Sequence, residues 1–108
     1  MTEPQWIAVA TEADLFEGAG IAVRPIDDEI AIYKTEAGEV FATDNLCTHD
    51  GHGRLCDGFL EGHEIECPLH QGRFDIRSGE ATLPPCVDAI RSYPAKVEDG
   101  KVWLKLVV

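Results

Sequence analysis

The sequence contains no long hydrophobic run. None of its apolar stretches approaches the roughly 20 residues that a membrane-spanning helix needs. The first residues, Met1 to Pro4, carry no basic segment followed by an apolar core, so no secretory signal is predicted. Internal repeats, low-complexity stretches and linkers are also absent. We therefore expect one cytoplasmic domain over residues 1–108, with no membrane partner.

Basic residues are scarce. Nine Lys and Arg stand against twenty Asp and Glu, which gives a formal net charge of −11. This charge disfavours nucleic acids and anionic membranes as partners. A basic protein surface suits it better, because opposite fields speed encounter. Taken alone, however, the acidity indicates little more than solubility.

Signals for disulfides and for covalent catalysis are also missing. The chain has four cysteines, an even number, but no export signal accompanies them. In a reducing compartment cysteines more often indicate metal binding or catalysis than disulfides. We find no set of residues that resembles a catalytic triad.

What the chain does contain is a series of short apolar segments typical of an all-β fold with an antiparallel sheet base. An Asp99-Gly100 turn predicts a hairpin, and Thr11 with Asp14 resembles a capping box at the start of a short helix. Trp6 and Trp103 lie in alternating strands and are predicted to belong to the core. The strands expected for this base are residues 6–9, 21–24, 29–34, 40–43, 90–98 and 101–107.

The middle of the chain has a different composition. Between about residues 45 and 85, Gly, His, Cys and Pro are dense, and the expected strands shrink to residues 63–66 and 73–75. This segment predicts a loop-rich subdomain, inserted into the base and built around something other than a hydrophobic core.

Two short motifs in this segment can bind metal. Cys47 and His49 form C-x-H, and after seventeen intervening residues Cys67 and His70 form C-x-x-H. Two thiolates and two imidazoles suit either a structural zinc ion or a two-iron cluster. Each motif supplies one Cys and one His, so two facing loops could direct both Cys to one iron and both His to the other. Zinc sites more often begin with a pair of closely spaced cysteines, which this chain lacks.

These motifs and the residues around them resemble the Rieske-type ferredoxin components of multicomponent aromatic-ring dioxygenases, with naphthalene and biphenyl dioxygenase ferredoxins the nearest in likeness. The resemblance covers essentially the whole chain. It is carried by Asn45–His49 (NLCTH), Asp57–Gly62 (DGFLEG) and Ile65–Asp75 (IECPLHQGRFD).

The resemblance implies a Rieske fold, with the cluster-binding subdomain at about residues 45–85. It implies one [2Fe–2S] cluster per chain, held by Cys47, His49, Cys67 and His70. It also implies a monomeric one-electron carrier, not an enzyme, between a flavin-dependent ferredoxin reductase and a terminal oxygenase. Two alternatives remain: the electron-transfer subunit of another redox enzyme, such as a nitrite reductase small subunit, and a structural zinc-binding interaction module.

The sequence departs from high-potential Rieske proteins at four positions. His52 and Leu69 stand where those proteins carry two disulfide-forming cysteines, and Gly72 and Phe74 stand where they carry hydroxyl donors to sulfur. Donors to sulfur stabilise the reduced cluster and raise its potential. The resemblance therefore implies a potential near the low end of the Rieske range, roughly −150 mV.

Other potentially reactive residues have plainer interpretations. Cys56 and Cys86 fall outside the ligand positions and are predicted to be ordinary thiols, with a place for Cys86 near the cluster left open. His52 and His63 are interpreted as solvated side chains, although His52 could tune or shield the cluster. For Arg73, pairing with a nearby acid and simple exposure are both open.

Overall fold

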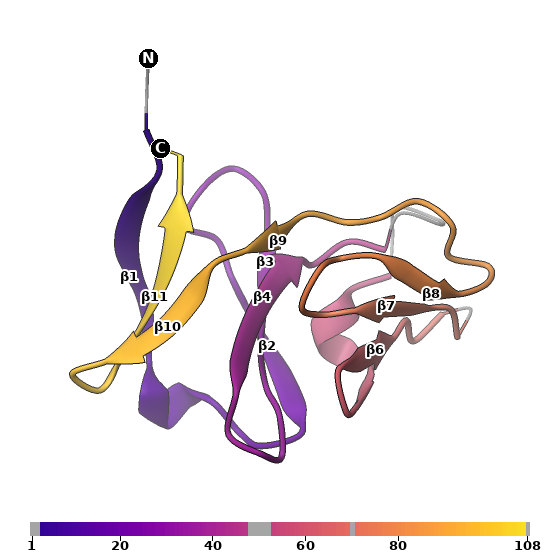
Figure 1. Cartoon of the computed structure of the whole chain (residues 1–108), viewed down its shortest axis with the longest axis horizontal. Coiled ribbons are helices and arrows are strands. Elements are labelled where there is room, and N and C mark those ends of the chain that lie inside the picture. The colour runs from indigo at the N-terminus through magenta and orange to yellow at the C-terminus, as the bar shows by residue number, and fades with distance from the viewer. Residues whose placement is uncertain (1–2, 48–52, 70, 108) are drawn as a thin grey trace.

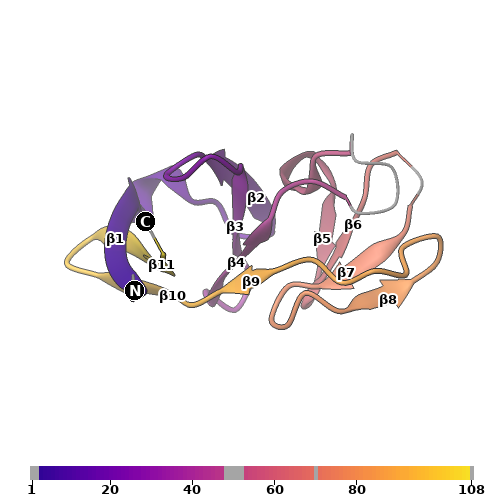
Figure 2. The same cartoon turned by 90° about the horizontal axis from the view of Figure 1, so that it is seen from above.

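A computed structural model describes residues 3–47, 53–69 and 71–107. Three antiparallel sheets lie in a row, with both chain ends at one side of the molecule (Figures 1 and 2). This confirms the expected all-β class. The helical segments among the described residues are single 3₁₀ turns, η1 (Glu12–Asp14) and η2 (Leu55–Asp57), and none is long and apolar enough to span a membrane.

The base comprises the first two sheets, and the third belongs to the middle of the chain. The first sheet has the order β1 (Gln5–Thr11), β11 (Lys101–Leu106) and β10 (Ala95–Glu98). The second has the order β2 (Ala19–Val23), β3 (Ile30–Lys34), β4 (Val40–Asp44) and β9 (Ser92–Tyr93). The third has the order β5 (Phe59–Glu61), β6 (Glu64–Glu66), β7 (Arg73–Asp75) and β8 (Ala81–Leu83).

Strand β3 joins the two hydrophobic cores of the molecule, one of which lies beneath the third sheet, so the prediction that the middle segment is built around something other than a hydrophobic core is wrong. Successive side chains of a strand point to opposite faces. Ile30 and Ile32 pack into the core of the base, whereas Ala31 and Tyr33 pack into the core beneath the third sheet. All four side chains are fully buried, so the strand fixes the third sheet against the base.

The predicted C-terminal hairpin is confirmed at its turn but not along its first strand. Glu98 pairs with Lys101 across Asp99 and Gly100, which both have positive φ, as a two-residue turn requires. The segment expected as one strand divides at Pro94: β9 pairs with β4, and β10 pairs with β11. Proline lacks an N–H, so it cannot continue the ladder as a donor.

The prediction that Trp6 and Trp103 belong to the core is wrong. The buried side chains of β11 are Val102, Leu104 and Leu106, so strand alternation places Trp103 on the outer face. Trp6 is 39% exposed on the neighbouring strand, where the ammonium of Lys96 lies 4.5 Å from its ring centroid.

The short helix expected after Thr11 is confirmed as a single 3₁₀ turn, η1, and the Thr11 N–H donates to Asp14 Oδ2 at 3.0 Å, as in a capping box. Another local prediction needs correction. His63 lies in the turn between β5 and β6, not in a strand, and its Nε2 lies 2.9 Å from Glu39 Oε1. The strands β5 and β8 were not predicted from the sequence.

Candidate metal centre

The first motif lies on a loop that is closed at its base by a ladder of backbone hydrogen bonds. The chain leaves β4 through Asn45 and Leu46 to Cys47, whose N–H donates to the carbonyl of Gly53 at 2.8 Å. Leu46 and Arg54 form an antiparallel bridge. The N–H of Leu55 donates to Asn45 O at 2.7 Å. Cys47 therefore lies at a fixed position where this loop begins.

The second motif lies on a loop of the same design. Cys67 follows β6, and its N–H donates to the carbonyl of Gly72, just before β7, at 2.8 Å. The N–H of Gln71 donates back to Cys67 O at 3.0 Å. In both loops the cysteine is the first residue and a glycine carbonyl closes the turn.

The structure brings the two cysteines together at Gly53. A Cβ placed on Gly53 would lie 2.6 Å from Cys67 Sγ and 3.4 Å from Cys47 Cβ. Both cysteines are almost completely buried, at 1% and 0% exposure. A converging pair of shielded thiols is a suitable sulfur donor set for an iron–sulfur centre. His49, His52 and His70 lie outside the described residues.

A third sulfur lies beside this pair. Cys86, on the segment between β8 and β9, places its Sγ 3.6 Å from Cys47 Sγ and is buried. Local sequence patterns could not reveal this contact, because the two residues are 39 positions apart. The four cysteines, all of them within the described part of the chain, form no disulfide.

Cys56 has different surroundings. Its Sγ accepts a hydrogen bond from Asn45 Nδ2 at 3.4 Å, and its N–H donates to Asn45 Oδ1 at 2.8 Å. Burial raises the pKa of the Cys56 thiol, which keeps it protonated near neutral pH.

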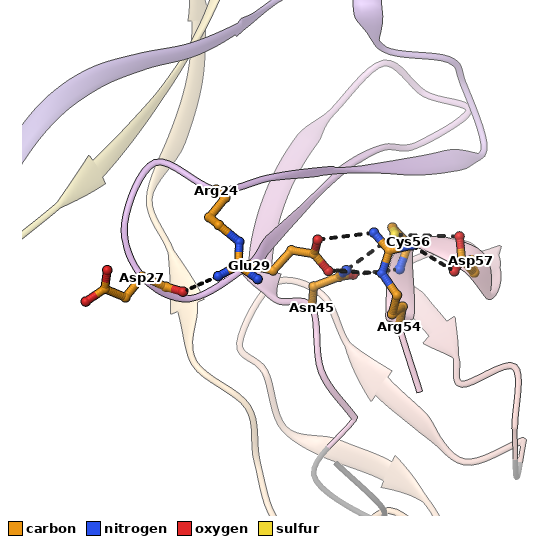
Figure 3. Close-up of polar contacts among 7 residues, drawn as sticks. All are labelled: Arg24, Asp27, Glu29, Asn45, Arg54, Cys56 and Asp57. Atoms are coloured by element: carbon orange, nitrogen blue, oxygen red, sulfur yellow. Dashed lines mark hydrogen bonds and ion pairs between the residues drawn. The ribbon is translucent and has the colours of Figure 1, made fainter. Parts of the chain in front are cut away.

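A polar network holds residues 54–57, the segment that follows the first loop, to the base (Figure 3). Glu29 binds the Arg54 guanidinium through both carboxylate oxygens, at 3.0 and 3.1 Å, and accepts a hydrogen bond from Asn45 Nδ2 at 2.6 Å. These contacts, the Arg54 hydrogen bond first, lower the pKa of Glu29.

Charged side chains also brace the second loop. Arg73, the first residue of β7, lies 3.1 Å from Glu66, 3.4 Å from Glu64 and 3.6 Å from Glu61. Of the two interpretations left open for Arg73, pairing with nearby acids is confirmed. Because Glu66 and Arg73 are also partners in the β6–β7 ladder, these ion pairs hold the stem from which the loop projects.

Comparison with known proteins identifies the kind of centre that these loops build. Residues 5–94 match the family model of the Rieske [2Fe-2S] domain. The chain belongs to the Rieske family. A ferredoxin component of the naphthalene 1,2-dioxygenase/salicylate 5-hydroxylase systems of Ralstonia sp. is 52% identical over 101 residues, which cover 94% of this chain and 95% of that one.

Solved Rieske structures agree with this assignment. The ferredoxin of Sphingomonas yanoikuyae B1 is 40% identical, with a TM-score of 0.86, covering 94% of this chain and 99% of that one. A structure described as a complex of reduced oxygenase and oxidized ferredoxin in carbazole 1,9a-dioxygenase matches at 29% identity and a TM-score of 0.83, covering 93% and 92%. A structure described as a putative NADH-dependent nitrite reductase small subunit from Mycobacterium tuberculosis, at 20% identity and a TM-score of 0.84 and covering 97% of each chain, shares the fold alone.

The cofactor of this Rieske protein is a [2Fe–2S] cluster of the Rieske type, and its role is electron transfer, not catalysis. The zinc-module alternative is therefore set aside. The buried and converging Cys47 and Cys67 suit the cluster. Within residues 3–47, 53–69 and 71–107, no group of three or more His, Cys, Asp or Glu side chains is placed to hold a metal ion.

Proposed function

We propose that this Rieske protein is the ferredoxin component of an aromatic-ring dioxygenase system, passing one electron at a time from a flavin-dependent reductase to a terminal oxygenase. The observation that carries this proposal is the 52% identity to such a ferredoxin component over nearly its whole length. A relationship this close across the complete fold favours the same place in an electron-transfer chain.

The ligand assignment is part of the proposal. Cys47 and His49 on the first loop, with Cys67 and His70 on the second, would hold the cluster. The two thiolates would neutralise the iron they bind, and the neutral imidazoles would leave their iron more electropositive, which would make the histidine side of the site the better place for an added electron. The burial of Cys47 and Cys67 supports their role as the sulfur ligands of the site. We treat residues 1–108 as one domain, with residues from about 45 to 85 as the cluster-binding subdomain.

The reduction potential is proposed to lie near the low end of the Rieske range. Gly72 has no side chain, and Phe74 is a fully buried hydrocarbon ring on β7. Neither can donate a hydroxyl hydrogen bond to a cluster sulfur. A low potential suits transfer between a flavin and an oxygenase.

Partners and location follow the same reasoning. The ferredoxin–oxygenase complex supports direct, transient docking with a terminal oxygenase. The reductase is inferred from the need for an electron source. Four cysteines without a disulfide are consistent with a reducing cytoplasm, and we propose a monomer there, with no nucleic-acid or membrane partner.

The ligand assignment is tested by substitution and electron paramagnetic resonance. The purified protein should be red-brown, and its dithionite-reduced form should give a rhombic signal that averages well below the free-electron value. Replacing His49 or His70 by alanine should abolish this signal. Cys56→Ser and His63→Ala serve as matched controls and should keep it, because those side chains contact Asn45 and Glu39 instead. Colourless protein with stoichiometric zinc would overturn the proposal.

The place in the electron chain needs a separate test. Reconstitution with the reductase and oxygenase of a naphthalene-type system should support product formation, and omitting this protein should prevent it. A protein that holds the cluster but transfers electrons only to a nitrite reductase would instead support the alternative.

A further inference from the structure

The segment between β8 and β9 carries a buried thiol that reaches both ligand loops. Cys86 is only 3% exposed, and its Sγ lies 3.6 Å from Cys47 Sγ in the first loop. On its other side the same sulfur packs directly on Gly72, which closes the second loop. A Cβ on Gly72 would lie 2.3 Å from Cys86 Sγ and 3.1 Å from Cys86 Cβ. The thiol therefore occupies the space that a side chain at position 72 would fill.

We propose that the Cys86 thiol is a positioning residue that donates an S–H···S hydrogen bond to the sulfur of Cys47 and thereby raises the reduction potential of the centre. This inference rests on the proposed function, in which Cys47 is a ligand.

Ligand chemistry settles the direction of the hydrogen bond. Between two free thiols, either sulfur could donate at this distance. A cysteine that binds metal is deprotonated, so Cys47 can only accept. Cys86 then has to supply the proton, and its burial excludes water that would compete for the acceptor.

The effect on the potential follows from charge. Reduction adds an electron and makes the ligand sulfurs more negative, so a donor to one of them stabilises the reduced state more than the oxidised state. Removing the donor should lower the potential. Cys86 would thus partly offset the absence of hydroxyl donors at positions 72 and 74.

The first test compares the midpoint potentials of three variants with that of the holoprotein. Cys86→Ala removes the donor and should lower the midpoint potential by about 28 mV. At 59 mV per tenfold, this corresponds to a shift of about threefold toward oxidised protein in the one-electron equilibrium with a redox dye of fixed potential. Cys86→Ser keeps a hydroxyl donor and should stay above Cys86→Ala. Cys56→Ala, the matched control, removes a thiol bonded to Asn45 and should leave the potential unchanged.

The second test detects the hydrogen bond itself in the unmodified protein. The reduced-minus-oxidised infrared difference spectrum should contain an S–H band that moves on reduction, shifts in D₂O and vanishes in Cys86→Ala. The S–H band of Cys56 should not respond to reduction and should therefore cancel in the difference spectrum; it should appear only in the absolute spectrum, and Cys56→Ala should remove it there. If Cys86→Ala fails to hold the cluster, this spectrum decides alone.

Equal potentials in the holoprotein and Cys86→Ala, or a Cys86 S–H band unaffected by reduction, would overturn the inference. Loss of the rhombic signal from a folded Cys86→Ser variant would also overturn it, because that result would make Cys86 a ligand. Absence of the rhombic signal from the unmodified protein would instead defeat the proposed function.

Discussion

Asn45 stabilises the first ligand loop through its side chain and its backbone. It is completely buried, and its amide binds Glu29 Oε1 and Cys56 Sγ while its Oδ1 accepts the Cys56 N–H. Its backbone N–H and carbonyl are bonded to Glu29 and Leu55. A buried polar side chain is stable only when its hydrogen bonds are made, so loss of one partner affects the others.

Glu29 makes this network dependent on pH. Its hydrogen bonds with Arg54 and Asn45 lower its pKa in the folded state below the ordinary value of 4.5. A group with a lowered folded pKa stabilises the fold above its unfolded pKa, and this contribution is lost as the pH falls through the folded pKa. The unmodified protein should therefore exceed Glu29→Gln in its free energy of unfolding by the full amount near neutral pH. This difference should shrink as the pH falls below 4.5.

Urea unfolding of both proteins across this pH range measures the effect. Asp27→Asn is the control, because Asp27 binds Arg24 through its backbone carbonyl, so changing its side chain should not alter the curve. A constant difference between Glu29→Gln and the unmodified protein from neutral pH to below pH 4 would contradict the prediction.

At the scale of the elements, prediction succeeded where a pattern was local and long enough. The positions of β3 and β4 and the Asp99-Gly100 turn follow from alternation and turn chemistry. Strands of three residues are too short for a reliable period: β6 and β7 were predicted, whereas β5 and β8, which are equally short, were not. The division at Pro94 and the outward face of Trp6 depend on which sheet each strand joins, which is decided by distant contacts. For the same reason, the contact between Cys86 and Cys47 could not be predicted from the sequence and was found only in the structure.

Position 53, where the two cysteine loops converge, should tolerate no side chain. Gly53→Ala places a methyl group 2.6 Å from Cys67 Sγ, closer than van der Waals contact allows, so the loops must separate. Iron and cluster absorbance per mole of protein should fall severalfold. Gly38→Ala is the matched control: at φ +89 it also strains the backbone, by about 1 kcal/mol or more, but its Cβ meets nothing within 4 Å.

Gly38→Ala should therefore lower the melting temperature while keeping full cluster content. Equal cluster content in both variants would show that Gly53 is not essential for the convergence of the two cysteines.

For the whole molecule, the excess of acid becomes meaningful once the role is electron transfer between proteins. The chain carries a net charge of −11. Many of its cations are already neutralised within the fold, since Arg54, Arg73, Arg77, Arg91 and Lys96 each pair with carboxylates. The field that a partner meets at a distance is therefore negative, and it favours basic docking surfaces on the proposed reductase and oxygenase.

Electron transfer to and from these partners should slow with salt. Because charges are screened within a Debye length of about 8 Å at 0.15 M ionic strength and about 3 Å at 1 M, the second-order rate constants should fall by roughly tenfold or more between low and high salt. Stopped-flow mixing at increasing NaCl measures both half-reactions. Reduction by the dithionite radical anion should instead accelerate, since salt weakens the repulsion between like charges, and a neutral small reductant should be indifferent. If the protein partners behave like the neutral reductant, docking does not depend on the acidic surface.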